Sequence, residues 1–362
     1  MAKQHTLVKE FLKNHSLVES NIRSFNEFIE IRMQEIVDEL SERIDSEDFE
    51  IKFGKISLDK PNQIEADGST KLITPAEARI RKLTYSAPIN VEISIKYEGQ
   101  SETAEVSLGR IPIIVKSNAC NLKDLSEDQL IGKYIDPSDP GGYFIVNGNE
   151  RVIAMAEDLA SNQTFIENKK GKLTLRLFSQ RGAYKIPVTL VENNDGILEV
   201  SFSRFRGIPV IVLLKALGLT SDAEIAKLIG KQNESLIVNL YEFPEIVSSD
   251  DALMHIAEQT SLQGTKKEIL DRAKQRMDSY FLPHVGLDKN SRLEKAKTLC
   301  KFVKQLFIAQ ENPEKSLTDK DHYGNKRVRL SGDLLSDLFR VNLNIFIREI
   351  QHSLQKTIKR NR

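Results

Sequence analysis

Basic side chains gather between residues 169 and 215, in a chain whose charges balance overall at 52 Lys and Arg against 52 Asp and Glu residues. The cations of this stretch are Lys169, Lys170, Lys172, Arg176, Arg181, Lys185, Arg204, Arg206 and Lys215, and the carboxylates around them are Glu167, Glu192, Asp195 and Glu199. Lys and Arg bind phosphate groups and supply the sequence-independent share of nucleic-acid affinity. Phe202 and Phe205 stand among these cations, as aromatic residues do on surfaces that bind single strands. The stretch predicts phosphate contact, and protection of strand edges by charge is the alternative.

Five carboxylates between residues 124 and 139 raise the question of a metal site. They are Asp124, Glu127, Asp128, Asp136 and Asp139. Asp-Pro and Ser-Asp steps form turns more often than ligand sets. The histidines His255, His284, His322 and His352 show no spacing suited to shared ligation. We therefore expect no metal ion and no other cofactor in this chain.

The sequence contains no recognisable motif of catalysis. It lacks a Gly-rich phosphate loop followed by Lys-Ser/Thr, an Asp-x-Asp-x-Asp run suited to paired magnesium ions, and a nucleophile elbow. Cys120 and Cys300 are its only cysteines, which excludes a disulfide framework and favours a reduced intracellular setting. No apolar run approaches the length of a membrane span, and the first residues lead into no signal core. We expect a soluble, cytoplasmic protein.

The basic stretch begins a second domain near residue 161. With 362 residues the chain is long enough for two domains with sizeable cores. Leu173, Leu175 and Leu177 alternate with polar residues, as do residues 198–202, and the turn-forming residues 193–196 lie between them. From Val210 onward the pattern is helical, including a helix capped by Thr265 that ends near Tyr280.

The first domain mixes helix and strand. Apolar residues at spacings of three and four predict a long helix from Glu19 to Glu42, whose other face is acidic and suits either solvent or a basic partner. Alternation predicts strands over residues 49–53 and 89–95, with a turn at Glu98-Gly99-Gln100. Residues 111–115 predict a buried strand, and Asn147-Gly148 predicts a tight hairpin between residues 143–146 and 151–153.

Two helices, Val210 to Leu217 and Asp222 to Ile229, are predicted to meet at a short turn containing Gly218. This is the outline of a helix-turn-helix. The second helix, however, offers only Lys227 as a DNA contact and carries two carboxylates, whereas a reading helix needs donors for base edges and phosphates. A packed helical hairpin is therefore the expectation, and a free-standing helix-turn-helix DNA-binding regulator is the alternative function. A scaffold that contacts only protein is a third.

The last predicted helix starts near Gly332 and carries an apolar stripe. The stripe comprises Leu334, Leu335, Leu338, Phe339, Ile345, Phe346 and Ile350. An amphipathic helix of this length needs a partner surface.

Two stretches carry a family resemblance: residues 108–122, LGRIPIIVKSNACNL, and residues 139–153, DPGGYFIVNGNERVI. Supporting stretches follow the same order in the chain: 24–29 (SFNEFI), 74–79 (TPAEAR), 83–88 (LTYSAP), 208–218 (IPVIVLLKALG) and 321–327 (DHYGNKR). Together they resemble the second-largest, β-like subunit of multisubunit DNA-dependent RNA polymerases, in the archaeal and eukaryotic style. The resemblance covers nearly the whole chain.

The resemblance implies an α+β fold of two domains, a protrusion interrupted by an inserted lobe. Residues 1–160 would form the first part of the protrusion, 161–322 the lobe, and 323–362 the helix that returns to the protrusion. These modules form one wall of the DNA cleft in the family, where the magnesium-binding aspartates belong to the largest subunit. Nucleotidyl transfer would then belong to the complex, located at the nucleoid. The implied partners are double-stranded DNA, the largest subunit, the small assembly subunits, and initiation and elongation factors.

The resemblance also assigns residues to roles. The motif positions Gly109, Arg110, Pro112, Gly141, Gly142, Asn147, Gly148, Glu150 and Arg151 would shape the protrusion. The residues expected to face DNA are Arg176, Arg181, Arg204 and Arg206 in the lobe, and Lys326, Arg327 and Arg329 where the chain passes back. Even the split archaeal form of the subunit continues past this point, so we expect the native polypeptide to extend beyond Arg362.

Overall fold

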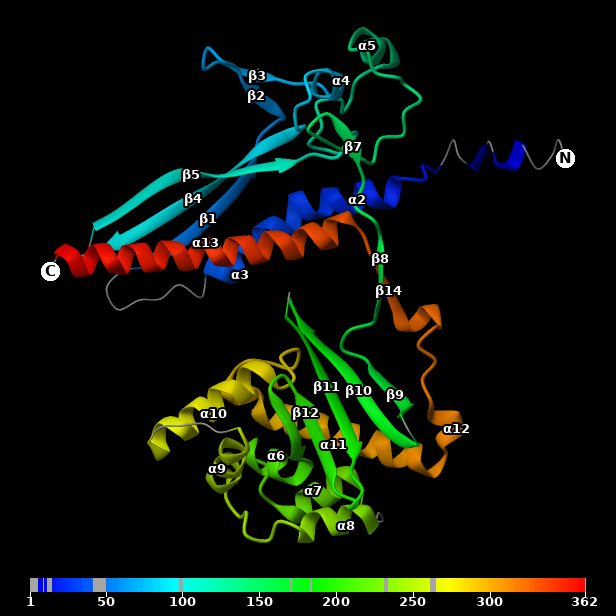
Figure 1. Cartoon of the computed structure of the whole chain (residues 1–362), viewed down its shortest axis with the longest axis vertical. Coiled ribbons are helices and arrows are strands. Elements are labelled where there is room, and N and C mark those ends of the chain that lie inside the picture. The colour runs from blue at the N-terminus through cyan, green and yellow to red at the C-terminus, as the bar shows by residue number, and fades with distance from the viewer. Residues whose placement is uncertain are drawn as a thin grey trace. The chain divides into compact units, whose positions relative to one another are not determined.

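The chain divides into two compact units, one formed by residues 1–157 with 328–362 and the other by residues 158–327 (Figure 1). The computed structural model describes residues 6–8, 10–11, 15–41, 50–97, 100–169, 171–182, 184–230, 234–260 and 265–361. Both units mix helices and strands, which confirms the predicted α+β class. Their assignment as protrusion and lobe stays a prediction.

The first unit begins with a helical rod of α2 (Glu19–Glu27), a π-helical turn (Phe28–Arg32) and α3 (Met33–Ser41). Phe28 and Met33 are both buried although they lie five residues apart. A π turn, with its i to i+5 hydrogen bonds, aligns residues at this spacing, so the apolar stripe continues along one face. The predicted helix is confirmed as far as Ser41, and Glu42 lies outside the described residues.

A three-stranded antiparallel sheet in the order β1 (Glu50–Leu58), β4 (Ser86–Tyr97) and β5 (Gln100–Pro112) packs on this rod. The predicted strands are confirmed, except that Phe49 and the turn residues Glu98 and Gly99 lie outside the described residues. The long helix α13 (Ser331–Asn361) completes the layer, and its Leu343 and Ile347 are buried against α3 and the sheet. Of the predicted apolar stripe, Phe339, Phe346 and Ile350 pack on this surface, whereas Leu338 and Ile345 are exposed.

Gly332, near the start of α13, comes very close to the backbone of α2. A Cβ atom on Gly332 would lie 2.0 Å from the carbonyl oxygen of Ser24. No residue larger than glycine fits this contact without a shift of one helix.

The first unit also contains a compact loop region. It holds the hairpins β2 (Asn62–Ile64) with β3 (Thr70–Leu72) and β6 (Phe144–Val146) with β7 (Asn149–Arg151), and the short helices α4 (Pro75–Ile80) and α5 (Glu127–Gly132). Asn147 and Gly148 have φ of 52° and 77°, which confirms the predicted hairpin turn. The predicted buried strand over residues 111–115 is confirmed only for residues 111 and 112. β5 ends at Pro112, and Ile113 and Val115 donate single backbone hydrogen bonds to Tyr85 and Tyr143, each at 2.9 Å.

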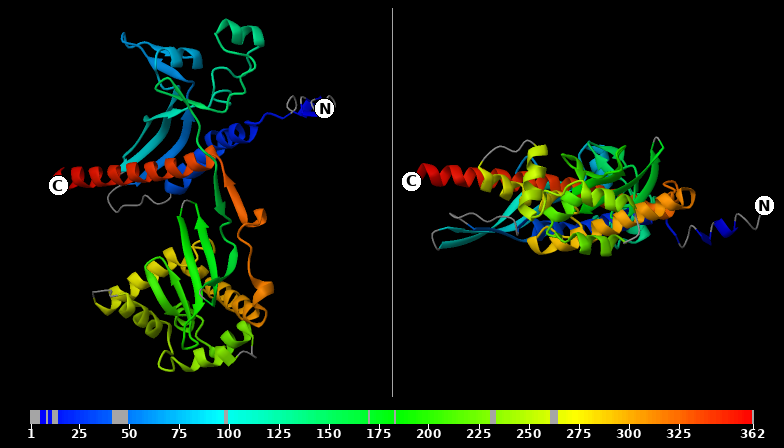
Figure 2. Two further views of the ribbon diagram at one scale, coloured as in Figure 1. Left: turned by 45° about the vertical axis from the view of Figure 1, so that its right-hand side comes forward. Right: turned by 90° about the horizontal axis from the view of Figure 1, so that it is seen from below.

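The second unit is built on a five-stranded antiparallel sheet in the order β13-β12-β11-β10-β9. Its strands are β9 (Thr164–Lys169), β10 (Lys172–Arg181), β11 (Tyr184–Glu192), β12 (Leu198–Phe202) and β13 (Phe205–Pro209). Leu175, Leu177, Val188 and Val200 belong to a core that also includes residues of the helices. The helices lie against one face of the sheet (Figure 2). These helices include α6 (Val210–Ala216), α7 (Asp222–Ile229), α8 (Glu234–Tyr241), α9 (Ser249–Gln259), α10 (Lys266–Tyr280) and α11 (Arg292–Glu311), which leads into α12 (Pro313–Ser316).

The sequence located β10 and β12 correctly but not the strand between them. The turn at residues 193–197 joins β11 to β12, and β10 pairs with β11 rather than β12. The expectation of helices alone after Val210 is also wrong. β14 (Lys326–Arg329) pairs with β8 (Ala156–Leu159), so the two chain segments that connect the units form a two-stranded sheet.

Candidate nucleic-acid interface

The five-stranded sheet of the second unit has one face toward the helices and one more open face. Burial alternates along β10, where Leu175, Leu177 and Ser179 are buried while Arg176 and Phe178 are half-exposed. Side chains two residues apart on a strand share a face. Arg176, one of the residues predicted to contact DNA, therefore lies on the open face together with Phe178.

Phe178 is flanked by two cations. The guanidinium carbon of Arg176 lies 4.6 Å from the centre of the Phe178 ring, and Nζ of Lys185, from β11, lies 4.8 Å from it. Lys185 also forms an ion pair with Asp158. Within the described part of the chain, Arg176 has no carboxylate partner. The distances of Arg176 and Lys185 from the centre of the Phe178 ring are those of cation–π contacts.

Arg204 and Arg206 lie at the end of the sheet formed by β12 and β13. Arg204 follows Ser203, whose φ of 50° marks a tight turn, and Arg206 is on the edge strand β13. Both side chains are exposed. Across the ranges that the structure describes, neither arginine forms an ion pair, so both are free to meet an anion.

Arg181 is separated from Arg176 by the sheet itself. It shares the strand parity of Leu177 and Ser179, so it belongs to the helix-covered face, where it is exposed at the end of β10. Its charge contributes to a lowered pKa of Lys295, which burial, the main cause, brings to about 8. The structure thus does not join all four predicted lobe arginines in one patch.

Lys326, Arg327 and Arg329, which were predicted to face DNA where the chain passes back to the first unit, have partners within the chain. Lys326 Nζ lies 3.4 Å from Asp321 and 6.0 Å from the centre of the Tyr323 ring. Arg327 is exposed and donates to the backbone carbonyls of Gly324 and Lys326, and Arg329 pairs with Asp337 of α13. Arg329 is therefore already neutralised, whereas Arg327 has no carboxylate partner among the residues that the structure describes.

Comparison with known proteins identifies the family. Residues 16–362 match the family model described as RNA polymerase beta subunit. The chain belongs to this family. It is 38% identical over 382 residues to the DNA-directed RNA polymerase subunit Rpo2N of Halobacterium salinarum, covering 98% of this chain and 72% of that protein. To Rpo2N of Methanocaldococcus jannaschii it is 36% identical over 383 residues, covering 100% of this chain and 76% of that protein.

A longer archaeal relative matches as well. The subunit Rpo2 of Saccharolobus shibatae is 36% identical over 371 residues, which cover 98% of this chain and 32% of that protein. The predicted resemblance to the N-terminal part of the archaeal RNA polymerase second-largest subunit is confirmed. As a member of this family, the chain is expected to work beside other polymerase subunits.

Two parts of the sequence-based site are wrong. Phe202 and Phe205 are buried, and their rings stack on each other at 4.9 Å in the core, so they offer no platform to a base. Lys215 is 4% exposed and binds the carbonyl of Ile246 at 2.9 Å and Asp222 at 3.1 Å, so it cannot reach a phosphate. Lys170 lies outside the described residues.

Sequence reasoning missed Phe178. The sequence contains a signal for it. Leu173, Leu175 and Leu177 occupy odd-numbered positions of the strand and Phe178 an even-numbered one, so Phe178 is expected on the opposite, solvent-facing side of the strand.

The helix-turn-helix outline of the alternative function fits the geometry poorly. Every residue of α6 is buried, and α7 buries Ile225 and Ile229. Its exposed side carries Asp222 and Glu224 next to Lys227. Two carboxylates on the candidate reading helix would repel a phosphate backbone.

In this polymerase family member the motif residues 108–153 hold the first unit together. The Tyr143 hydroxyl donates to Asp139 at 2.5 Å, and Arg79 Nε lies 2.9 Å from Glu150. Burial and the Asp139 carboxylate raise the pKa of Tyr143. Arg110 donates to Asn62 and Ser86. These contacts hold Tyr143, Arg79 and Arg110 within the first unit, although the partners of Arg110 are uncharged groups.

The acidic residues of the first unit also have internal partners. Glu27 pairs with Arg32 at 2.9 Å, Glu30 accepts from Asn118 at 2.5 Å, and Glu39 pairs with Arg340. Asp136 accepts hydrogen bonds from Ser138, which lower the Asp136 pKa. Among the described residues, no group of three or more His, Cys, Asp or Glu side chains could hold a metal ion. That the chain needs no cofactor stays a prediction.

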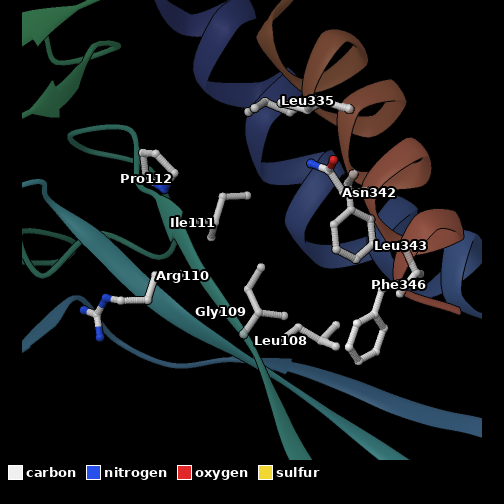
Figure 3. A pocket seen from close by; sticks show the side chains of 12 residues that line it. Leu108, Gly109, Arg110, Ile111, Pro112, Leu335, Asn342, Leu343 and Phe346 are labelled. Carbon is white, nitrogen blue, oxygen red and sulfur yellow. The ribbon is translucent and has the colours of Figure 1, made fainter. Parts of the chain in front are cut away.

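A pocket of about 270 Å³ lies between β5 and α13 in the first unit (Figure 3). Its lining is apolar, with Leu108, Ile111, Leu343 and Phe346 directed into it, while Arg110 points away toward its partners Asn62 and Ser86. Such a lining has no group for acid, base or nucleophilic chemistry. Among the described residues, no helix is both long and apolar enough to cross a membrane.

Proposed function

We propose that this chain forms one wall of the DNA cleft of a multisubunit RNA polymerase and binds the sugar-phosphate backbone of duplex DNA through its second unit. Nucleotidyl transfer, with its magnesium ions, then belongs to the largest subunit of the complex. The wall also offers docking surface to initiation and elongation factors.

The observation that carries this proposal is the pair Arg204 and Arg206. Both are exposed cations without a carboxylate partner in the described chain, in a protein whose formal net charge is zero. Without a global field, DNA affinity must come from local cations. Guanidinium groups match phosphate geometry and need no particular base sequence.

The test is the salt dependence of binding to a duplex by the full chain. Each lost phosphate contact lowers the slope of log affinity against log salt by about 1. We expect the double variant Arg204→Glu/Arg206→Glu to bind duplex DNA more weakly and with a slope smaller by about 2. The matched control is Lys266→Glu/Lys267→Glu, which changes the charge of the same unit equally at two exposed lysines of α10.

Four outcomes of this binding experiment bear on the candidate functions. Weaker, sequence-blind binding in the arginine variant but not in the lysine variant supports the cleft wall. Unchanged slope and affinity contradict the assignment of Arg204 and Arg206. Base-specific protection of a DNA site would favour the regulator, and absence of binding even at low salt would favour a scaffold that contacts only protein.

A further inference from the structure

We propose that Phe178 is a positioning residue, which holds Arg176 and Lys185 as a seat for the phosphate backbone of DNA and does not itself stack on a base. This inference rests on the proposed function of the second unit. It names Phe178, which neither the sequence motifs nor the charge pattern had singled out, and it specifies the chemistry that this face of the sheet recognises.

The strand register places Phe178 between the two cations. Phe178 is opposite Pro187, whereas Arg176 is opposite Thr189 and Lys185 is opposite Gln180. Arg176 and Lys185 therefore come from the two rows that flank the row of Phe178, at opposite ends along the strands. Successive rows on one face are about 7 Å apart, which suits a contact between a ring and the end of a long side chain from each neighbouring row.

The ring is consequently covered by charge rather than open to a base. The Arg176 guanidinium is 4.6 Å and the Lys185 ammonium 4.8 Å from the ring centre. A stacking platform needs a free π face. Here two cations lie over the ring, so the group presented to DNA is positive charge.

Holding these cations in place favours phosphate binding. Free Arg and Lys side chains lose much rotamer freedom when they bind, and a side chain that is pre-positioned loses less. Lys185 forms an ion pair with Asp158, whereas Arg176 has no carboxylate partner among the described residues. Arg176 is thus the member of the pair whose phosphate contact depends most on Phe178.

The experiment is a double-mutant cycle on the full chain with duplex DNA as the probe. The variants are Phe178→Leu, Arg176→Gln and the double variant, and Tyr184→Leu is the control because it removes another exposed aromatic side chain of the same hairpin. We expect Phe178→Leu to weaken binding by about two- to fivefold. We expect Phe178→Tyr, which keeps the ring, to bind like the parent chain.

The readout is the coupling between Phe178 and Arg176 in DNA binding, which a merely structural role of Phe178 would not produce. If Phe178 acts through Arg176, the double variant loses less than the product of the two single fold-changes. Independent, multiplicative losses would overturn the proposal, as would an unchanged affinity of Phe178→Leu. If Phe178→Leu has a lower unfolding temperature than the parent, Phe178→Met replaces it in the cycle.

A single-stranded probe of the same length distinguishes binding of the phosphate backbone by the two cations from stacking of a base on Phe178. The seat predicts that Phe178→Leu weakens duplex and single-stranded binding by the same factor. A loss confined to the single strand would show stacking and overturn the proposal. The proposed function itself fails separately, if the parent chain binds no DNA or if Arg204 and Arg206 have no effect.

Discussion

Replacement of Gly332 by alanine should selectively destabilise the first unit. The added Cβ would lie 2.0 Å from the Ser24 carbonyl oxygen and 2.5 Å from the Ser24 carbonyl carbon. Both are backbone atoms of α2, so relief requires that α2 and α13 move apart and loosen the packing of Phe28 against Phe339 and of Leu343 in the core. Overpacking typically costs about 1 to 3 kcal/mol, and a backbone obstacle belongs at the upper end of that range.

The assay is thermal unfolding of Gly332→Ala beside Gly132→Ala. A loss of about 3 kcal/mol in a unit of this size lowers its unfolding temperature by about 6 to 12 °C. The control glycine ends α5 and a Cβ there would have nothing within 4 Å, so Gly132→Ala should unfold at or slightly above the parent temperature. Equal unfolding temperatures for Gly332→Ala and the parent chain would refute the close docking of α13 on α2.

Two further predictions concern buried polar groups. Tyr85→Phe removes a fully buried hydroxyl that accepts a hydrogen bond from the Asn121 backbone N–H at 2.9 Å. Leaving that N–H unpaired should lower the free energy of unfolding, measured with urea, by about 1 to 3 kcal/mol. An unchanged urea midpoint would contradict this hydrogen bond. Burial lowers the pKa of Lys295 from 10.5 to about 8, so between these pH values the unfolded chain binds the proton more strongly than the folded chain. The free energy of unfolding should therefore rise with pH across this window, and Lys295→Met should lack that part of the rise, while identical pH profiles would show that Lys295 does not titrate abnormally.

Local signals in the sequence predicted the elements that depend on local chemistry. The Asn147-Gly148 turn and the helix capped by Thr265 that ends at Tyr280 follow from neighbouring residues and appear as predicted. Strand β11 was not predicted from the sequence, although Ile186, Val188 and Leu190 alternate along it, and the signal that argued against a central strand is Pro187.

The candidate site was predicted less well because availability of a charge is a tertiary property. Arg176 and Arg181 look equivalent in a list of cations, yet strand parity puts them on opposite faces of the sheet. Lys215 follows five buried apolar residues, Val210 to Leu214, which should have marked it as part of the core. The pairing of Arg329 with Asp337 could be foreseen only as one of many possible pairs, since nothing local selects it.

The most direct test of the central claim is a site-specific cross-link in the intact polymerase. The polymerase would be purified through a tag on this chain and bound to duplex DNA, with a photoreactive residue in place of Arg204 or, in a second preparation, in place of Lys227 on α7. The proposed cleft wall predicts that a tagged complex containing the largest subunit is recovered and that DNA is cross-linked from position 204 but not from position 227. Recovery of this chain alone, or cross-linking from position 227 only, would contradict the account and favour the helix-turn-helix regulator.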